Sequence, residues 1–201
     1  MATITFPTDG SIGIGDYSEA LEYDVQLTTS RAGRITTRML PGSRWRAKLT
    51  FATTDKNGAI GRQRAEALLT SLRGGANVLA LYHPRKQAPL GTARGAPTVA
   101  ATAAIGANSL TLTGMTDGQT LLRGDLWGLG SQRVMLTADV TVASGQAVIT
   151  FEPALRASVL SGTVAIWDKP TVNFIPTDPA IWLPYIGSKF GGPIDVELVE
   201  V

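Results

Sequence analysis

The 201-residue sequence contains no cysteine and one histidine, His83. The absence of cysteine excludes disulfide bonds, thiolate metal sites and a cysteine nucleophile. A zinc site would therefore need carboxylate ligands, and no closely spaced acidic cluster offers such a set. His83 begins the segment HPRK, where we expect a structural or solvent-exposed role rather than a general base. The sequence thus predicts no catalytic residue, no cofactor, no metal and no enzymatic activity.

Long hydrophobic runs are missing as well. No stretch of about 18 apolar residues is available to span a membrane. The first ten residues, MATITFPTDG, lack the basic start and the apolar stretch of a signal peptide. We therefore expect a soluble protein that is made in a cytoplasm and does not insert into membranes. Hydrophobic residues still make up 44% of the chain, which is enough for a packed core.

The net charge is only +2, but the charges are unevenly distributed. Residues 1–30 contain five acids and no lysine or arginine, whereas residues 31–64 contain nine bases and one acid. A nucleic-acid-binding domain would normally carry a basic surplus throughout. Opposite patches on one chain favour either strand pairing within the chain or a repeated contact between copies. The simpler alternative is that the charges face solvent and contribute little.

The most regular segment is RWRAKLTF, which alternates charged and apolar residues from Arg44 to Phe51. In a strand, its apolar side chains would form one buried face and its cations the other. The last residues, IDVELVEV, predict a second strand, with an acidic face. The two strands could pair, because opposite charges across a strand pair contribute about 0.2–1 kcal/mol each. Our candidate subunit interface consists of six charged residues on these strands: Arg44, Arg46, Lys48, Asp195, Glu197 and Glu200.

Periodicity predicts the other elements of the first domain. Residues 1–16 have weak periodicity and predict an extended arm. Residues 21–27 alternate as in a half-buried strand, residues 34–40 form a second strand, and together with RWRAKLTF these suggest an antiparallel meander. A helix is predicted over about residues 59–73, because apolar residues recur at helical spacing before a double glycine. Residues 77–82 read as a short buried strand.

The composition changes at residues 84–98, which are rich in proline, glycine and alanine and read as a linker or long loop. Beyond them, short strands are predicted at regular spacing over residues 109–113, 133–137, 146–151 and 163–167. They predict a small β-barrel-like module over residues 96–168. If the last strand pairs with RWRAKLTF, this module is inserted into a domain formed by residues 1–95 plus 169–201. The predicted fold class is therefore mainly β: a β-sandwich or barrel flanked by one α-helix, with an inserted β module.

Three further motifs could indicate a binding function, but each has a simpler structural explanation. The glycine-rich GSIGIG lacks the preceding strand and the following lysine of a phosphate-binding loop. Arg123-Gly124-Asp125 is more simply a β-turn than an adhesion tripeptide. Four aromatic residues could stack on sugar rings, although core packing is the commoner role for such residues: Phe174, Trp182, Tyr185 and Phe190.

The order of these features resembles the minor tail proteins of long-tailed, siphophage-like bacteriophages, and in particular the distal tail protein. The resemblance rests on four segments in sequence: SRWRAKLTF, RAEALLTSLRGG, LALYHP and the acidic strand within residues 190–201. The intervening residues 104–168 are similar to small β domains that recur in phage structural proteins. No single motif among these is as specific as a metal-binding signature.

The resemblance implies a ring-forming tail-hub protein, usually hexameric, located in the virion tail and made in the host bacterial cytoplasm. Its expected partners are copies of itself, the tail tube protein and the hub proteins of the tail tip or baseplate, with DNA only in transit through the lumen. Two alternatives stay open: another tail structural protein, such as a tube or tail-completion protein, and a carbohydrate-binding module for host attachment. The basic strand face would contact either a neighbouring subunit or the passing DNA.

Overall fold

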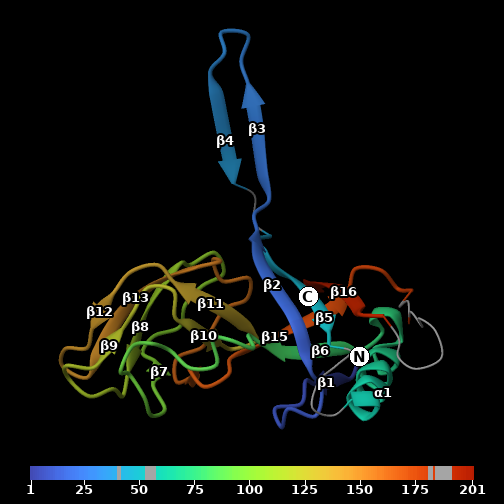
Figure 1. Cartoon of the computed structure of the whole chain (residues 1–201). Coiled ribbons are helices and arrows are strands. Elements are labelled where there is room, and N and C mark those ends of the chain that lie inside the picture. Colours follow the sequence, from blue (N-terminus) through green and yellow to red (C-terminus); the bar gives the residue numbers. More distant parts are fainter. Residues whose placement is uncertain (40–41, 53–57, 181–182, 184–191) are drawn as a thin grey trace. The chain divides into compact units, whose positions relative to one another are not determined.

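A computed structural model describes residues 1–39, 42–52, 58–180, 183 and 192–201. The protein is mainly β, with 44% of the described residues in strands, and it contains a nearly closed, barrel-like six-stranded sheet (Figure 1). The predicted fold class is confirmed. The chain divides into two compact units. The first comprises Met1–Leu21, Arg44–Leu81 and Val172–Val201, and the second comprises Glu22–Ser43 and Tyr82–Thr171.

The first unit is built on a six-stranded sheet in which distant parts of the chain are neighbours. The strands lie in the order β1 (Thr3–Thr5), β6 (Val78–Tyr82), β15 (Thr171–Pro176), β16 (Ile194–Glu200), β5 (Arg44–Phe51) and β2 (Ile14–Glu22). β5 has the predicted bounds. Its apolar residues Trp45, Ala47, Leu49 and Phe51 are all buried, which confirms the predicted buried face.

One helix accompanies this sheet. α1 spans Gly58–Ser71, close to the predicted range, and a 3-10 turn, η1 (Arg73–Gly75), follows it. Ala65, Leu69 and Leu72 are buried, as expected for residues that share one helical face. Gly74 has a φ of 62°, a left-handed conformation that glycine adopts without a side-chain clash. Arg73 and Gly75 also have positive φ values, so the left-handed turn that follows the helix includes the predicted double glycine.

The predicted meander is wrong. β5 pairs with β16 and β2, whereas β3 (Val25–Thr29) and β4 (Ile35–Met39) pair with each other in a separate two-stranded sheet. The expected half-buried strand over residues 21–27 is also wrong, because β2 ends at Glu22 and every residue of β3 is exposed. Alternation specified a strand here, but in the described chain no second layer covers its apolar side.

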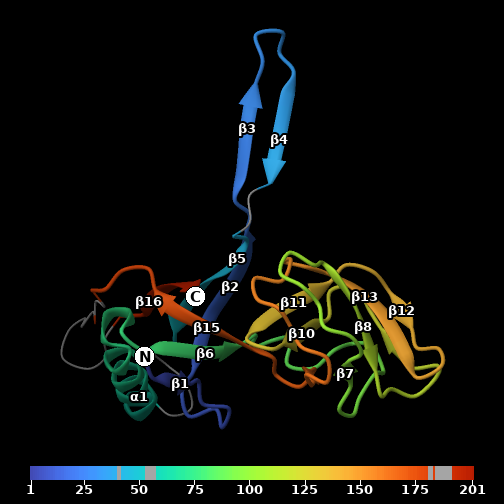
Figure 2. The ribbon, with the colours of Figure 1, turned by 180° about the vertical axis from the view of Figure 1, so that it is seen from behind.

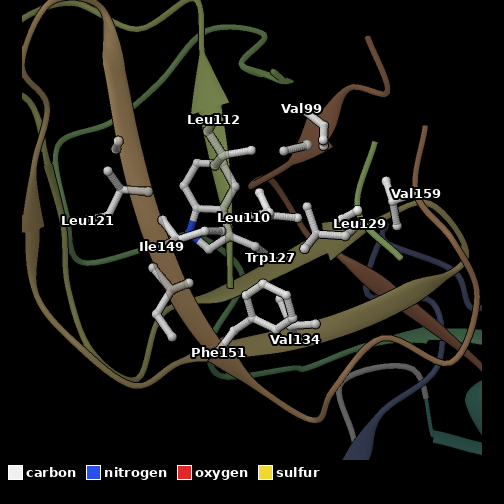
Figure 3. Packing of buried hydrophobic residues seen from close by; sticks show 14 of the residues in the cluster. Val99, Leu110, Leu112, Leu121, Trp127, Leu129, Val134, Ile149, Phe151 and Val159 are labelled. Carbon is white, nitrogen blue, oxygen red and sulfur yellow. The ribbon is translucent and has the colours of Figure 1, made fainter. Parts of the chain in front are cut away.

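The second unit contains the β module. Its larger sheet has the strand order β14 (Ala165–Ile166), β10 (Leu126–Leu129), β11 (Gln132–Leu136), β13 (Gln146–Glu152), β8 (Ser109–Thr113) and β7 (Thr98–Val99). A second pair joins β12 (Val140–Thr141) to β9 (Thr120–Leu121). Figure 3 shows the core of the module, in which Trp127 and Phe151 lie among aliphatic residues such as Leu112, Val134 and Ile149. Three of the predicted strands, over residues 109–113, 133–137 and 146–151, are confirmed to within one residue.

The proline-rich segment over residues 84–98 is an ordered part of this unit. The Asp125 carboxylate accepts hydrogen bonds from the backbone N–H groups of Leu90 and Gly91, at 2.8 and 3.1 Å. The Arg94 guanidinium donates to backbone carbonyls of the same segment, and it lies 4.9 Å from the centre of the Trp167 ring. In the structure, the segment that contains the module begins at Tyr82. The composition of the sequence placed this start at residue 96.

Candidate functional site on the charged sheet face

The predicted basic and acidic strands lie side by side. β16 runs antiparallel to β5, with Glu197 opposite Lys48 and Asp195 opposite Thr50. Directly opposed residues in an antiparallel pair project to the same side of the sheet. The pairing predicted from charge is therefore confirmed. We call the exposed side of these two strands the charged face, formed by Arg44, Arg46, Lys48, Asp195 and Glu197.

The charged face carries a row of cations on one strand and a row of acids on the neighbouring strand. Arg44, Arg46 and Lys48 project from β5, and Asp195 and Glu197 project from β16 beside them. The Thr50 hydroxyl donates a hydrogen bond to Asp195 Oδ1 at 2.5 Å. The acids on β16 offset the cations of β5 beside them, so this face lacks the net positive charge that favours binding of nucleic-acid phosphates.

Two shallow hollows mark this face. One, of about 250 Å³, is lined by β2, β5 and β16 and includes Glu19, Arg46 and Leu198. The other, of about 270 Å³, includes Asp178 and Asp195. Lys48, Thr177 and Glu197 line both hollows. Each hollow is large enough to accept a side chain from another molecule.

Glu200 does not belong to the charged face. It is 2% exposed and lies on the buried side of β16 with Ile194, Val196 and Leu198. Its Oε2 accepts a hydrogen bond of 2.8 Å from the backbone N–H of Trp45. The alternation of buried and exposed residues continues through Val199 to the end of β16. Every second residue from Ile194 is buried, and Glu200 is one of them. We therefore remove Glu200 from the candidate interface, because a buried side chain is not available to a second subunit.

His83 has a structural role in the turn that follows β6. Its Nδ1 accepts hydrogen bonds from the backbone N–H groups of Arg85 and Lys86, at 3.2 and 3.1 Å. Burial lowers the pKa of His83, and the nearby Lys86 charge acts in the same direction. Both effects favour the neutral imidazole that can accept these bonds. Among the residues that the structure describes, no group of three or more acidic or histidine side chains is placed to hold a metal ion.

The Arg-Gly-Asp tripeptide forms a turn between β9 and β10, as expected. Asp125 is 4% exposed, and its carboxylate also accepts the Leu122 N–H at 3.0 Å. Arg123 instead pairs with Asp139 at 3.3 Å on the surface. A receptor that recognises this tripeptide would need the Asp125 carboxylate, which is already occupied by backbone donors.

The aromatic and glycine-rich motifs provide no site in the described chain. Phe174 is fully buried in β15, which leaves no ring face for a sugar. Trp182, Tyr185 and Phe190 lie outside the described residues. In the GSIGIG segment, Asp9 Oδ1 accepts the Ser11 N–H, and β2 begins at Ile14. The segment therefore leads into an edge strand rather than into a helix N-terminus, which a phosphate loop requires.

A second surface was missed at the sequence level. β3 and β4 form an amphipathic hairpin, with Val25, Leu27 and Ile35 on one side and Gln26, Thr28, Thr36 and Arg38 on the other. The alternation in both strands is visible in the sequence, but it led to a prediction of a buried face. We call Val25, Leu27 and Ile35 the apolar side of the hairpin.

No protein-family model and no curated protein sequence matches this chain. In the part of the chain that the structure describes, no helix combines the length and apolar character needed to cross a membrane.

Proposed function

We propose that this protein is a structural component of a bacteriophage tail: a ring-forming distal tail protein that joins the tail tube to the tip or baseplate around a DNA channel. Its copies assemble into a hexamer in the virion tail, and DNA passes through the lumen only in transit. The protein has no catalytic role in this proposal. Its axial partners are the tube protein and the hub proteins of the tip or baseplate.

The observation that carries the proposal is the insertion of a complete β module into a sheet that the last strand completes. β16 pairs with β5, and the module occupies the chain between β6 and β15. The family resemblance implies this plan: a β hub domain with one helix and an inserted β module. The mixed charged face further supports an assembling protein, because closed rings use two different patches on each subunit.

The proposal is tested by the mass and shape of the purified protein. We expect light scattering at several concentrations to show a discrete oligomer and negative-stain images to show rings with a hole wide enough for a DNA duplex. Long tubes would instead favour the runner-up, a tube protein. A monomer at every concentration, with and without purified tail tubes as a template, would contradict the proposal.

The role of the charged face is tested by charge reversal and exchange. Lys48→Glu places like charges opposite each other on β5 and β16, and it also alters the outer surface. The exchange Lys48→Glu with Glu197→Lys restores the cross-strand pair while leaving the outer pattern inverted. If the face contacts a neighbour, the double variant folds like the wild type but assembles poorly. Normal assembly of the double variant would remove Lys48 and Glu197 from the interface.

The same purified protein distinguishes the remaining alternatives. Salt-dependent binding of duplex DNA to the isolated oligomer would show that the cations face the lumen and hold phosphates. A carbohydrate-binding module would bind glycans on an array as a monomer. The buried position of Phe174 removes one of the four aromatic residues on which that alternative was based.

A further inference from the structure

The β3–β4 hairpin exposes apolar side chains that nothing in the described chain covers. Every residue from Glu22 to Arg38 is exposed. Leu27 is 68% exposed and Ile35 is 66% exposed, although both belong to well-formed strands with five paired positions. A two-stranded hairpin alone in water is marginally stable at best. A hairpin of this composition therefore needs a surface to pack against.

The hairpin has the form of a docking element with two distinct sides. Its register places Leu27 opposite Thr37 and Thr29 opposite Ile35, so that apolar and methyl-bearing residues share one side. The tip is shaped by Ser30, whose hydroxyl accepts the Arg34 N–H at 3.1 Å, and by Gly33, with a φ of 75°. The tip and the strand after it are basic, with Arg31, Arg34 and Arg38.

The first unit offers a complementary surface. β2 is the last strand of its sheet and pairs with β5. The sheet is nearly closed into a barrel, but its described strand order ends at β2 without a pairing to β1. The exposed residues of β2 include Asp16 and Glu22, and the chain before residue 31 contains no base. A long open strand edge invites pairing with another strand. The hairpin is thus basic and has an uncovered apolar side, whereas the β2 edge is acidic and can accept a further strand.

We propose that the hairpin is an arm that docks on the β2 edge of a second copy of this chain. β4 adds to β2 as an extra strand, the second copy covers the apolar side of the hairpin, and Arg34 and Arg38 approach the acids of β2. Each subunit gives an arm on one side and receives one on the other. Such a head-to-tail contact closes into a ring when the rotation per subunit permits.

This inference rests on the proposed function, and hairpin variants separate the two. Leu27→Ser with Ile35→Ser removes the apolar side, and the matched control Gln26→Ser with Thr36→Ser changes the other side of the same strands. We expect the apolar-side variant to associate more than about tenfold more weakly than the wild type in sedimentation and light scattering. The control should assemble normally. Far-UV circular dichroism and thermal unfolding should be the same for both variants at a concentration where both are monomeric, because all four side chains are exposed.

Charge reversal identifies the second copy as the partner. An arm variant, Arg34→Glu with Arg38→Glu, and an edge variant, Asp16→Arg with Glu22→Arg, should each stay monomeric. Mixing the two should restore assembly in alternating order, because each reversed arm then meets a reversed edge. Hydrogen exchange should show new protection of the amides of β2 and β4 upon assembly.

The outcomes are distinct. If the wild type forms rings and the Leu27/Ile35 variant forms them equally well, the arm proposal is overturned and the ring stands. If the reversed pair fails to complement, the arm does not bind the β2 edge and the proposal is again overturned. A wild type that never assembles contradicts the arm and the ring together. Loss of assembly in the apolar-side variant, with recovery in the mixed reversed pair, supports the arm.

Discussion

Two five-residue strands of similar composition, each with leucine and two threonines, have opposite environments in this molecule. β3 reads VQLTT and β8 reads SLTLT, and each pairs with an antiparallel neighbour over five positions. Leu112 in β8 is fully buried, whereas Leu27 in β3 is 68% exposed. Local sequence therefore specifies the strand and its apolar side in both cases, but it does not specify what covers that side.

The difference arises from the surrounding layers. β8 packs its apolar side into the module core, where Trp127, Leu121 and Ile149 come from other strands (Figure 3). β3 has only β4 beside it within the described chain. Burial of a leucine side chain stabilises a fold by about 1.5–3 kcal/mol relative to its exposure. In β3 no other part of the described chain supplies that stabilisation to Leu27.

The largest expected effect comes from truncating the two leucines. Leu112→Ala should lower the unfolding free energy of the isolated protein by about 2–5 kcal/mol, because it leaves a cavity in a packed core. Leu27→Ala should change it by less than about 0.5 kcal/mol, as is usual for exposed positions. Urea unfolding at a concentration where the protein is monomeric measures both. Equal losses of unfolding free energy in Leu112→Ala and Leu27→Ala would show that the two leucines do not differ in burial.

The next effect concerns the aspartate that organises the start of the module. Asp125→Ala removes the acceptor of three backbone N–H groups, those of Leu90, Gly91 and Leu122. We expect a loss of about 2–3 kcal/mol, because hydrogen bonds to a charged acceptor are strong and the Gly91 N–H would be left buried without an acceptor. Asp139→Ala is the control, since its pair with Arg123 is exposed, and it should unfold nearly as the wild type does. If Asp125→Ala lowers the unfolding free energy no more than Asp139→Ala does, residues 84–98 are held by other contacts.

A smaller effect is expected at the hairpin tip. Gly33 has a φ of 75°, and no atom lies within 4 Å of a Cβ placed there, so Gly33→Ala adds backbone strain without a clash. The strain should cost the hairpin about 1 kcal/mol. Backbone chemical shifts of Thr28 and Thr36 should then move toward random-coil values, while those of the module stay unchanged. Ala32→Gly is the matched control. Unchanged hairpin shifts in Gly33→Ala would mean that the turn tolerates a side chain.

The smallest effect is a dependence of stability on pH. Folding lowers the pKa of His83 from 6.5, so the unfolded chain binds the proton more readily than the folded chain does. Stability from this group is therefore fully present above pH 6.5 and declines as the pH falls through the lowered pKa. His83→Asn keeps an acceptor for the turn but does not titrate. The difference in melting temperature between this variant and the wild type should change between pH 7.5 and 5.5, and a constant difference would refute the role of His83.

Regular periodicity made much of the fold predictable from the sequence. β5, β8 and α1 were found because their apolar residues recur at the spacing of a strand or a helix. β10, with the sequence LWGL, was missed, because all four of its residues are buried and it shows no alternation. The order of the strands in the sheet depends on distant pairings, which explains why the predicted meander was wrong. Of the pairings between distant strands, the sequence indicated only that of β5 with β16, through their opposite charges.

The candidate site was predictable in part for the same reason. Opposite charges on two alternating strands identified the charged face. Glu200 was misplaced because the exposed set was chosen by charge rather than by position along the strand. The apolar side of the hairpin could not be recognised as exposed, since exposure depends on which layers surround a strand and not on the strand itself.

The position of the inserted module has a consequence for evolution and engineering. β6 and β15 are neighbours in the sheet and run in opposite directions, so the chain leaves and re-enters the sheet at one edge (Figure 2). A short turn could join them directly, which makes the module a cassette that can be exchanged without breaking the frame. Under the proposed tail function, replacing the module should leave the charged face on β5 and β16 unchanged, because that face belongs to the frame.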